Sequence, residues 1–113
     1  MPFIDSKITV ALSESKKERL KTRLGQAISL LHKPESYLMV GFSDNYDLFM
    51  GGKKLEKGAF VSVRLLGDAR REDCAKMTKA IAAILEEELG IPGDNIYTAY
   101  QGIANWGMGE NLF

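Results

Sequence analysis

Two halves of the sequence carry matching residues in the same order, and this repeat constrains the fold more than any other feature. The matched pairs, each displaced by 58 positions, are Leu31 and Leu89, Pro34 and Pro92, Leu38 and Ile96, and Phe42 and Tyr100. A repeated unit is also the unit that packs. The pattern therefore predicts one domain over residues 1–113, built from pseudo-repeats of about 1–57 and 58–113, each a strand, a helix and a strand.

The first half has the periodicities of these three elements. Apolar and polar residues partly alternate over Phe3–Val10, as in a half-buried strand. Ser15 and Glu18 match a capping box at a helix start. Apolar residues then recur at helical spacing until Pro34, whose preceding residue disfavours helix. The apolar run Tyr37–Ser43 predicts a second strand with little solvent on either side.

The second half repeats this order. The β-rich segment Phe60–Leu66 is followed by Asp68, a candidate helix N-cap. The helical pattern then runs to Gly90, where a glycine is typical of a helix end. The last long strand is predicted over Asn95–Tyr100. Between the halves, Gly51-Gly52 predicts a hairpin or a bulge.

The predicted topology leaves one face of the sheet uncovered. Two right-handed strand-helix-strand crossovers in one sheet place both helices on the same face. The sequence has no third helix for the other face, so we expect further copies of the chain to cover it. The short apolar tail Trp106–Phe113 should dock on its own chain or on a neighbour. The predicted fold class is α/β, with a four-stranded mixed sheet, two helices on one face and an oligomeric assembly.

Charge and cysteine content exclude several functions. Fifteen basic and fifteen acidic residues cancel without forming a block of either sign, which argues against nucleic acid as a partner. The single cysteine, Cys74, excludes a disulfide framework and Cys-x-x-Cys chemistry. No apolar run reaches the roughly 18 residues of a membrane span, and no signal segment is recognisable. We expect a cytosolic protein without a metal or cofactor, with leaderless secretion as the alternative.

Pro2 is the main candidate for chemistry. If Met1 is removed, Pro2 presents a free secondary amine, and α-amino groups have pKa values of about 7.7–8.0. Burial or a neighbouring cation would lower that pKa and leave a neutral base at pH 7. The competing interpretation is that proline simply stands at the first position of a strand.

Several short motifs, taken in chain order, indicate a family. They are Met1-Pro2, Lys33-Pro34-x-x-Tyr37, Phe49-x-Gly51-Gly52, Leu66-Gly67, Asp94-Asn95-Ile96-Tyr97 and the terminal Phe113. With these motifs the chain resembles the tautomerase superfamily, in the branch of macrophage migration inhibitory factor and D-dopachrome tautomerase. The resemblance implies a homotrimer whose sheets enclose a channel, with active sites between subunits. It also implies cofactor-independent keto-enol tautomerisation of phenylpyruvate-like acids.

The same resemblance implies residue roles. Pro2 would be the general base and acid, and Lys33 would bind the substrate carboxylate and lower the pKa of Pro2. The backbone at Leu66 would hydrogen-bond the substrate, and Tyr97 would pack on it from a neighbouring subunit. The other substrate-binding candidates are Tyr37, Arg64, Met108 and Phe113.

Simpler interpretations of these residues stay open. Lys33 can be a cation at a helix end, Arg64 a solvated strand residue, and the aromatic side chains ordinary interface packing. Ala99 and Met108 replace an asparagine and a tryptophan of the best-known members, which puts the substrate preference in doubt.

Two alternative functions also stand. One is a secreted, cytokine-like protein that binds a cell-surface receptor and keeps residual tautomerase activity. The other, a weaker one, is dehalogenation or decarboxylation of small unsaturated acids, for which only Arg64 offers the additional charged group near Pro2.

Overall fold

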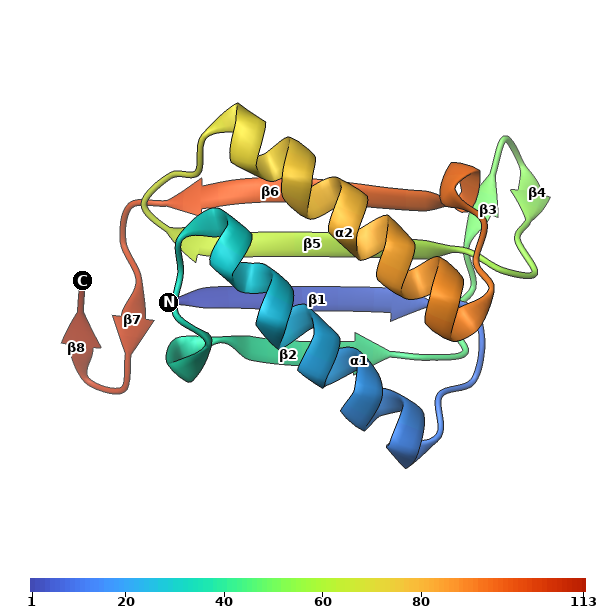
Figure 1. The fold of residues 1–113 in the computed structure, drawn as a ribbon, viewed down its shortest axis with the longest axis horizontal. Helices are drawn as coiled ribbons and strands as arrows, with labels where there is room; N and C mark the ends of the chain where they lie inside the picture. Colours follow the sequence, from blue (N-terminus) through green and yellow to red (C-terminus); the bar gives the residue numbers. More distant parts are fainter.

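A computed structural model describes residues 1–113. The centre of the molecule is a four-stranded sheet. Its strands are β1 (Pro2–Ile8), β2 (Met39–Ser43), β5 (Ala59–Leu66) and β6 (Ile96–Ile103). They lie in the order β2-β1-β5-β6 (Figure 1). The outer pairs, β1 with β2 and β5 with β6, are parallel, and the central pair of β1 and β5 is antiparallel. The mixed sheet is therefore two β-α-β units joined side by side.

Both helices cross the same face of the sheet, as the crossover rule predicts (Figure 1). They are α1 (Glu14–Ala27), which continues as the 3-10 turn η1 (Ile28–Leu31), and α2 (Arg71–Leu89). Each helical segment is followed by a proline and a 3-10 turn, η2 (Glu35–Tyr37) or η3 (Gly93–Asn95), before the next strand begins. The two units thus share their turns as well as their main elements.

Both predicted helix caps are wrong. Helix α1 is capped by Ser13, whose hydroxyl accepts a hydrogen bond from the Lys16 amide at 3.1 Å, and Ser15 lies inside the first turn. Helix α2 begins after Arg70, which makes no side-chain cap. Asp68 lies too early for that role and packs instead beside Gly102.

Three predicted strand boundaries also shift. The first strand is Pro2–Ile8 rather than Phe3–Val10. The second begins at Met39, because Glu35–Tyr37 folds as a 3-10 turn after the proline. The last strand extends to Ile103, beyond the predicted end at Tyr100. Apolar residues in the sequence indicate that these strands exist. They do not show where hydrogen bonding to the neighbouring strand begins or ends.

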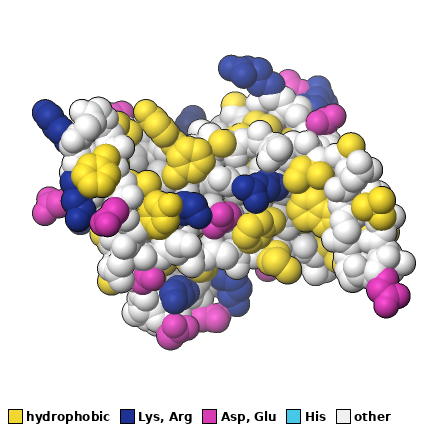
Figure 2. Space-filling view, turned by 180° about the vertical axis from the view of Figure 1, so that it is seen from behind, with side chains coloured by type: hydrophobic (Ala, Val, Ile, Leu, Met, Phe, Trp, Pro, Cys, Tyr) yellow, Lys and Arg dark blue, Asp and Glu magenta, His cyan; other side chains and the backbone are white.

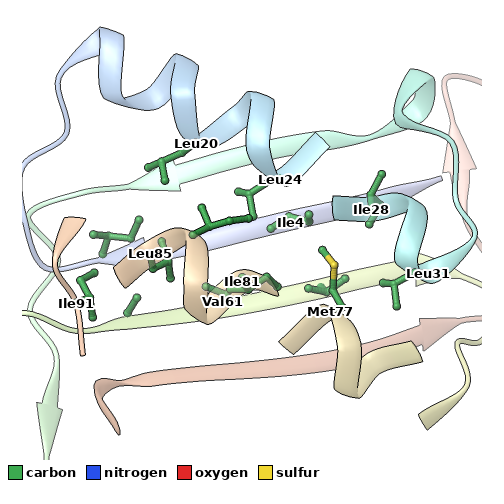
Figure 3. Packing of buried hydrophobic residues seen from close by; sticks show 14 of the residues in the cluster. Ile4, Leu20, Leu24, Ile28, Leu31, Val61, Met77, Ile81, Leu85 and Ile91 are labelled. Carbon is green, nitrogen blue, oxygen red and sulfur yellow. The ribbon is translucent and has the colours of Figure 1, made fainter. Parts of the chain in front are cut away.

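The hydrophobic core lies between the helices and the sheet (Figure 3). Alternate residues of β1 and β5 point into it and are fully buried, whereas the residues between them face the other side. Burying one such aliphatic side chain contributes about 1.5–3 kcal/mol. The fully buried residues labelled in Figure 3 include Ile4, Leu20, Leu24, Val61, Met77, Ile81 and Leu85.

The opposite face of the sheet carries no helix, so the predicted uncovered face is confirmed. In Figure 2, hydrophobic side chains gather toward both ends of this face, with charged side chains between them. The pairing register aligns its side chains in three rows. These are Met39, Phe3, Arg64 and Gln101; Gly41, Asp5, Ser62 and Ala99; and Ser43, Lys7, Phe60 and Tyr97.

Two small hairpins extend from opposite ends of the sheet (Figure 1). Strands β3 (Phe49–Met50) and β4 (Lys53–Lys54) enclose Gly51-Gly52, the hairpin alternative of the sequence prediction. Both glycines have positive φ, 58° and 79°, as a two-residue hairpin turn of this kind requires. The C-terminal tail forms the other hairpin, with β7 (Gly107–Met108) paired to β8 (Asn111–Leu112). Neither α-helix combines the length and the apolar character that crossing a bilayer needs.

Candidate active site

A pocket of about 510 Å³ opens where β1 begins, between the end of the sheet and the C-terminal tail. The tail hairpin lies beside the N-terminus in Figure 1. Most of the lining is apolar, and Arg64 is its only charged side chain. The residues that line it are Met1, Pro2, Phe3, Tyr37, Met39, Arg64, Ile103, Trp106, Gly107, Met108 and Gly109.

Pro2 is buried at the first position of β1, where it pairs with Leu65 of β5. A proline is compatible with the first residue of a strand because it need not donate to the ladder there. The environment of the chain start disfavours positive charge. Burial lowers the pKa of the Met1 amino group, and the charge of Lys33 lowers it further. An amine one residue further in, on Pro2, would meet the same two influences.

Leu66 connects the chain start to Lys33. Its amide donates to the Met1 carbonyl at 3.1 Å. Its carbonyl accepts from the Lys33 ammonium, also at 3.1 Å. Lys33 reaches this position after His32, which leaves the 3-10 turn η1 in the left-handed conformation with φ 59°. A cation and a backbone donor thus meet at one residue, Leu66, close to the chain start.

The other predicted residues divide between the pocket and more distant places. Tyr37, Arg64 and Met108 line the same pocket as Pro2. Phe113 does not, but it closes the tail through reciprocal backbone hydrogen bonds with Trp106 at 2.8 and 3.2 Å. Sequence reasoning therefore named four side chains that share one pocket, although they are far apart in the chain.

Tyr97 lies elsewhere in its own chain. Tyr97 pairs with Phe60 of β5, and Phe60 pairs with Lys7 of β1. Because Lys7 is five residues from Pro2 along β1, Tyr97 is at least roughly 16 Å from Pro2. Its side chain is 58% exposed and packs edge-to-face on Phe60, with ring centroids 6.3 Å apart. Ala99, two residues on, lies on the same uncovered face. Within one subunit neither residue can contact a ligand at Pro2.

Tyr97 lines a second apolar pocket of about 360 Å³, beside the β3–β4 hairpin at the far end of the sheet. Phe49, Leu55 and Phe60 also line it. The largest exposed apolar groups of the chain therefore lie at two ends of the molecule, one next to Pro2 and one next to Tyr97.

Four further side chains line the Pro2 pocket without having been predicted from the sequence, namely Phe3, Met39, Ile103 and Trp106. Phe3 and Met39 are cross-strand neighbours on the uncovered face. Trp106 is the only tryptophan of the chain. The apolar, glycine-rich composition of the tail was a signal that it docks, but sequence alone did not show where. No group of three or more His, Cys, Asp or Glu side chains is placed to hold a metal ion.

The chain is therefore an α/β protein of two β-α-β units in one sheet, with a pocket at the end of the sheet where Pro2 begins β1. The family model described as Macrophage migration inhibitory factor (MIF) matches residues 1–112, and the chain belongs to this family. Comparison with curated protein sequences finds no match.

Solved structures agree with this assignment. Leishmania major MIF2 has 31% identity, with all of this chain and 97% of that chain covered and a TM-score of 0.93. A migration inhibitory factor of Toxoplasma gondii has 29% identity, with 98% of this chain and 99% of that chain covered and a TM-score of 0.90. A fused 4-OT protein, described as a symmetric trimer, has the same fold at 19% identity, covering 97% and 94% of the two chains, with a TM-score of 0.84.

Proposed function

We propose that the protein is a cofactor-independent keto-enol tautomerase of phenylpyruvate-like 2-oxo acids, with Pro2 as the general base and acid. The observation that carries this proposal is the position of Pro2, buried at the edge of a largely apolar pocket beside Lys33 and the Leu66 backbone. Membership of the family supports the reaction class. A receptor-binding role has no particular surface feature of this chain in its favour.

The chemistry needs one group that exchanges a proton at neutral pH. As the enol becomes the ketone, neutral Pro2 takes the proton of the C2 hydroxyl and becomes an ammonium, and the C2–O bond becomes a carbonyl. The electron pair of the C2=C3 bond takes up a proton at C3, delivered by the Pro2 ammonium. The reverse direction returns the C3 proton to neutral Pro2, so no atom or electron is gained or lost.

Lys33 and Leu66 would hold the acid end of the substrate. The Lys33 ammonium supplies positive charge, and the Leu66 amide supplies a directed donor. A carboxylate bound by a cation and an N–H group makes charge-assisted hydrogen bonds, which are stronger than neutral ones. The side chain of the substrate would then extend into the apolar part of the pocket.

Removal of Met1 is required for this mechanism. While Met1 is present, the Pro2 nitrogen is part of an amide and has no basic lone pair. The Met1 carbonyl also occupies the Leu66 amide, the donor assigned to the substrate. Processing would therefore expose the base and free the donor in one step.

We further propose a homotrimer in which Tyr97 of one subunit completes the Pro2 pocket of the next. The uncovered sheet face and the distance between Pro2 and Tyr97 within one chain support this arrangement. It would pair the exposed apolar groups at the two ends of the molecule across the subunit boundary. Each subunit would remain a single domain of two pseudo-repeats.

The decisive experiment compares wild type with Pro2→Ala, after intact-mass measurement shows that both proteins have lost Met1. Alanine keeps a free amine but loses the ring and its fixed φ, and Pro2→Gly adds backbone freedom. We expect phenylpyruvate ketonisation, followed by ultraviolet absorbance, to fall about a hundredfold or more, because the amine that remains is no longer held in position by the ring. Unchanged turnover in both variants would reject Pro2 as the base.

A further inference from the structure

We propose that Trp106 is the residue that selects an aromatic side chain on the substrate. Trp106 and Met108, two residues apart in the tail, both line the pocket that contains Pro2, and Trp106 contributes the indole. The inference rests on the proposed function for the reaction, but it concerns binding and can be tested without turnover.

The fold of the tail fixes the position of Trp106. Its amide donates to the Phe113 carbonyl and its carbonyl accepts from the Phe113 amide, at 3.2 and 2.8 Å. The short β7–β8 ladder continues this pairing from Gly107 to Leu112. The indole is half-buried, whereas the following glycine and Met108 are exposed. The only tryptophan of the chain is therefore anchored on a hairpin and directed into the Pro2 pocket.

The rest of the pocket matches an aromatic ligand. Phe3, Met39 and Ile103 supply further apolar surface around the indole. At about 510 Å³ the pocket lies within the range of about 300–1,000 Å³ found for ligand sites, well above the needs of a short aliphatic acid. Aromatic rings attract one another through their π-systems beyond the area that they bury. An aryl group extending from a carboxylate at Lys33 would find such a partner in Trp106.

Fluorescence gives a direct test, because Trp106 is the sole tryptophan. The probe is 3-phenylpropanoate, which has the carboxylate and the ring of phenylpyruvate but no carbonyl, and so cannot tautomerise. The matched control is butanoate, which lacks the ring. With mature wild-type protein excited at tryptophan wavelengths, we expect a saturable shift with 3-phenylpropanoate and none with butanoate at the same concentrations.

Kinetics with two variants provides the second test. Deuterium exchange at C3, followed by NMR, measures turnover of phenylpyruvate and of 2-oxobutanoate under the same conditions. In Trp106→Leu the preference for the aryl substrate, as a ratio of kcat/KM values, should fall about five- to tenfold. The loss should appear in KM rather than kcat, because the contact is made equally in ground and transition states. Trp106→Phe should restore most of the preference.

The outcomes separate this inference from the proposed function. A saturable fluorescence response in a protein that does not tautomerise would reject the function and keep the aromatic subsite. A protein that ketonises phenylpyruvate but shows no fluorescence response would reject the subsite and keep the function. An unchanged aryl preference in folded Trp106→Leu would also overturn the inference. If Trp106→Leu does not fold, the test is the fluorescence response of wild type together with the aryl preference of Trp106→Phe. Absence of the fluorescence response would then overturn the inference.

Discussion

The Leu66 amide lies 3.1 Å from the Met1 carbonyl oxygen, and this hydrogen bond ties the first residue of the chain to the end of β5. The carbonyl of the same residue, Leu66, accepts from Lys33. A donor, a cation and the chain start are thus held together by one backbone unit. The chemistry that we propose depends on what happens there when Met1 is removed.

We predict that Leu66 loses its protection from hydrogen exchange when Met1 is removed. The amide then has no partner within the chain, so its exchange should accelerate, and 3-phenylpropanoate should slow it again by supplying a carboxylate oxygen. Hydrogen exchange followed by NMR on the retained and processed forms measures this. Equal protection of Leu66 in both forms, without ligand, would contradict the assignment of its amide to the substrate.

Replacing Lys33 should change both binding and pH dependence. A positive neighbour disfavours the protonated amine, so Lys33→Met should raise the pKa of Pro2. The neutral base then appears only at higher pH, and the acidic limb of the kcat/KM profile should move to higher pH. Loss of a charged hydrogen bond to the carboxylate should also lower kcat/KM about ten- to a hundredfold.

Lys33→Arg is the matched control because it keeps the charge. Its acidic limb should stay close to that of wild type, even if KM rises. An unshifted limb in folded Lys33→Met would show that Lys33 does not influence the pKa of Pro2.

Gly102 should be essential for the geometry at the end of the sheet. A methyl group there would collide with the Gly67 carbonyl and the Asp68 side chain, in the turn that directly follows Leu66. We expect Gly102→Ala to cost about 1–3 kcal/mol in the free energy of unfolding, the range for overpacking. Gly93→Ala is the control, because a Cβ there meets no other atom and needs no positive φ. Its effect on denaturant unfolding should stay below about 1 kcal/mol. Equal stability of the two variants would contradict the close approach at Gly102.

Glu88 should contribute to acid sensitivity. Hydrogen bonds from Arg19, at 2.8 and 3.0 Å, and contributions from Arg23 and Lys16, lower its pKa from 4.5 to about 2. The folded state therefore binds this proton less readily than the unfolded chain. The stabilisation is present above about pH 4.5 and is lost as the pH falls toward 2. Between pH 7 and pH 3, urea unfolding should show a smaller loss of stability in Glu88→Gln than in wild type. Equal losses in the two proteins would show that the ion pairs of Glu88 do not contribute to acid sensitivity.

Subunit mixing tests whether Tyr97 acts across a subunit boundary. Pro2→Ala and Tyr97→Ala should each be nearly inactive alone. After unfolding and refolding together in equal amounts, about a quarter of the sites in a closed trimer would combine a native Pro2 with a native Tyr97. Activity should return to about that fraction. Mixtures that stay inactive, or full activity of Tyr97→Ala alone, would contradict the shared site.

The sequence predicted much of the fold because its strongest signals were periodic. The offset between Pro34 and Pro92 marked equivalent turns, and in the structure each proline is followed by a 3-10 turn and a strand. The uncovered sheet face followed from crossover handedness and from the lack of a third predicted helix. The caps were less predictable, because Ser13 and Ser15 are chemically identical and only backbone geometry decides between them.

The sequence pointed to the place of the candidate site through two motifs, Met1-Pro2 and Lys33-Pro34-x-x-Tyr37. Trp106 was not predictable, since an aromatic residue in a tail can dock in many places, and its position depends on backbone pairing with Phe113. Phe3 and Met39 escaped notice because they follow from strand register, which the sequence specifies only through tertiary contacts.

Titration of the Pro2 nitrogen tests the central claim most directly. Mature protein labelled with ¹⁵N-proline, with loss of Met1 verified by mass, can be followed by NMR across the neutral range. We predict that the pKa of the Pro2 amine lies below the value of about 7.7–8.0 of an ordinary chain start, so that a larger fraction of the amine is neutral at pH 7. A Pro2 amine that titrates like a free peptide end, or full activity in protein that keeps Met1, would contradict it.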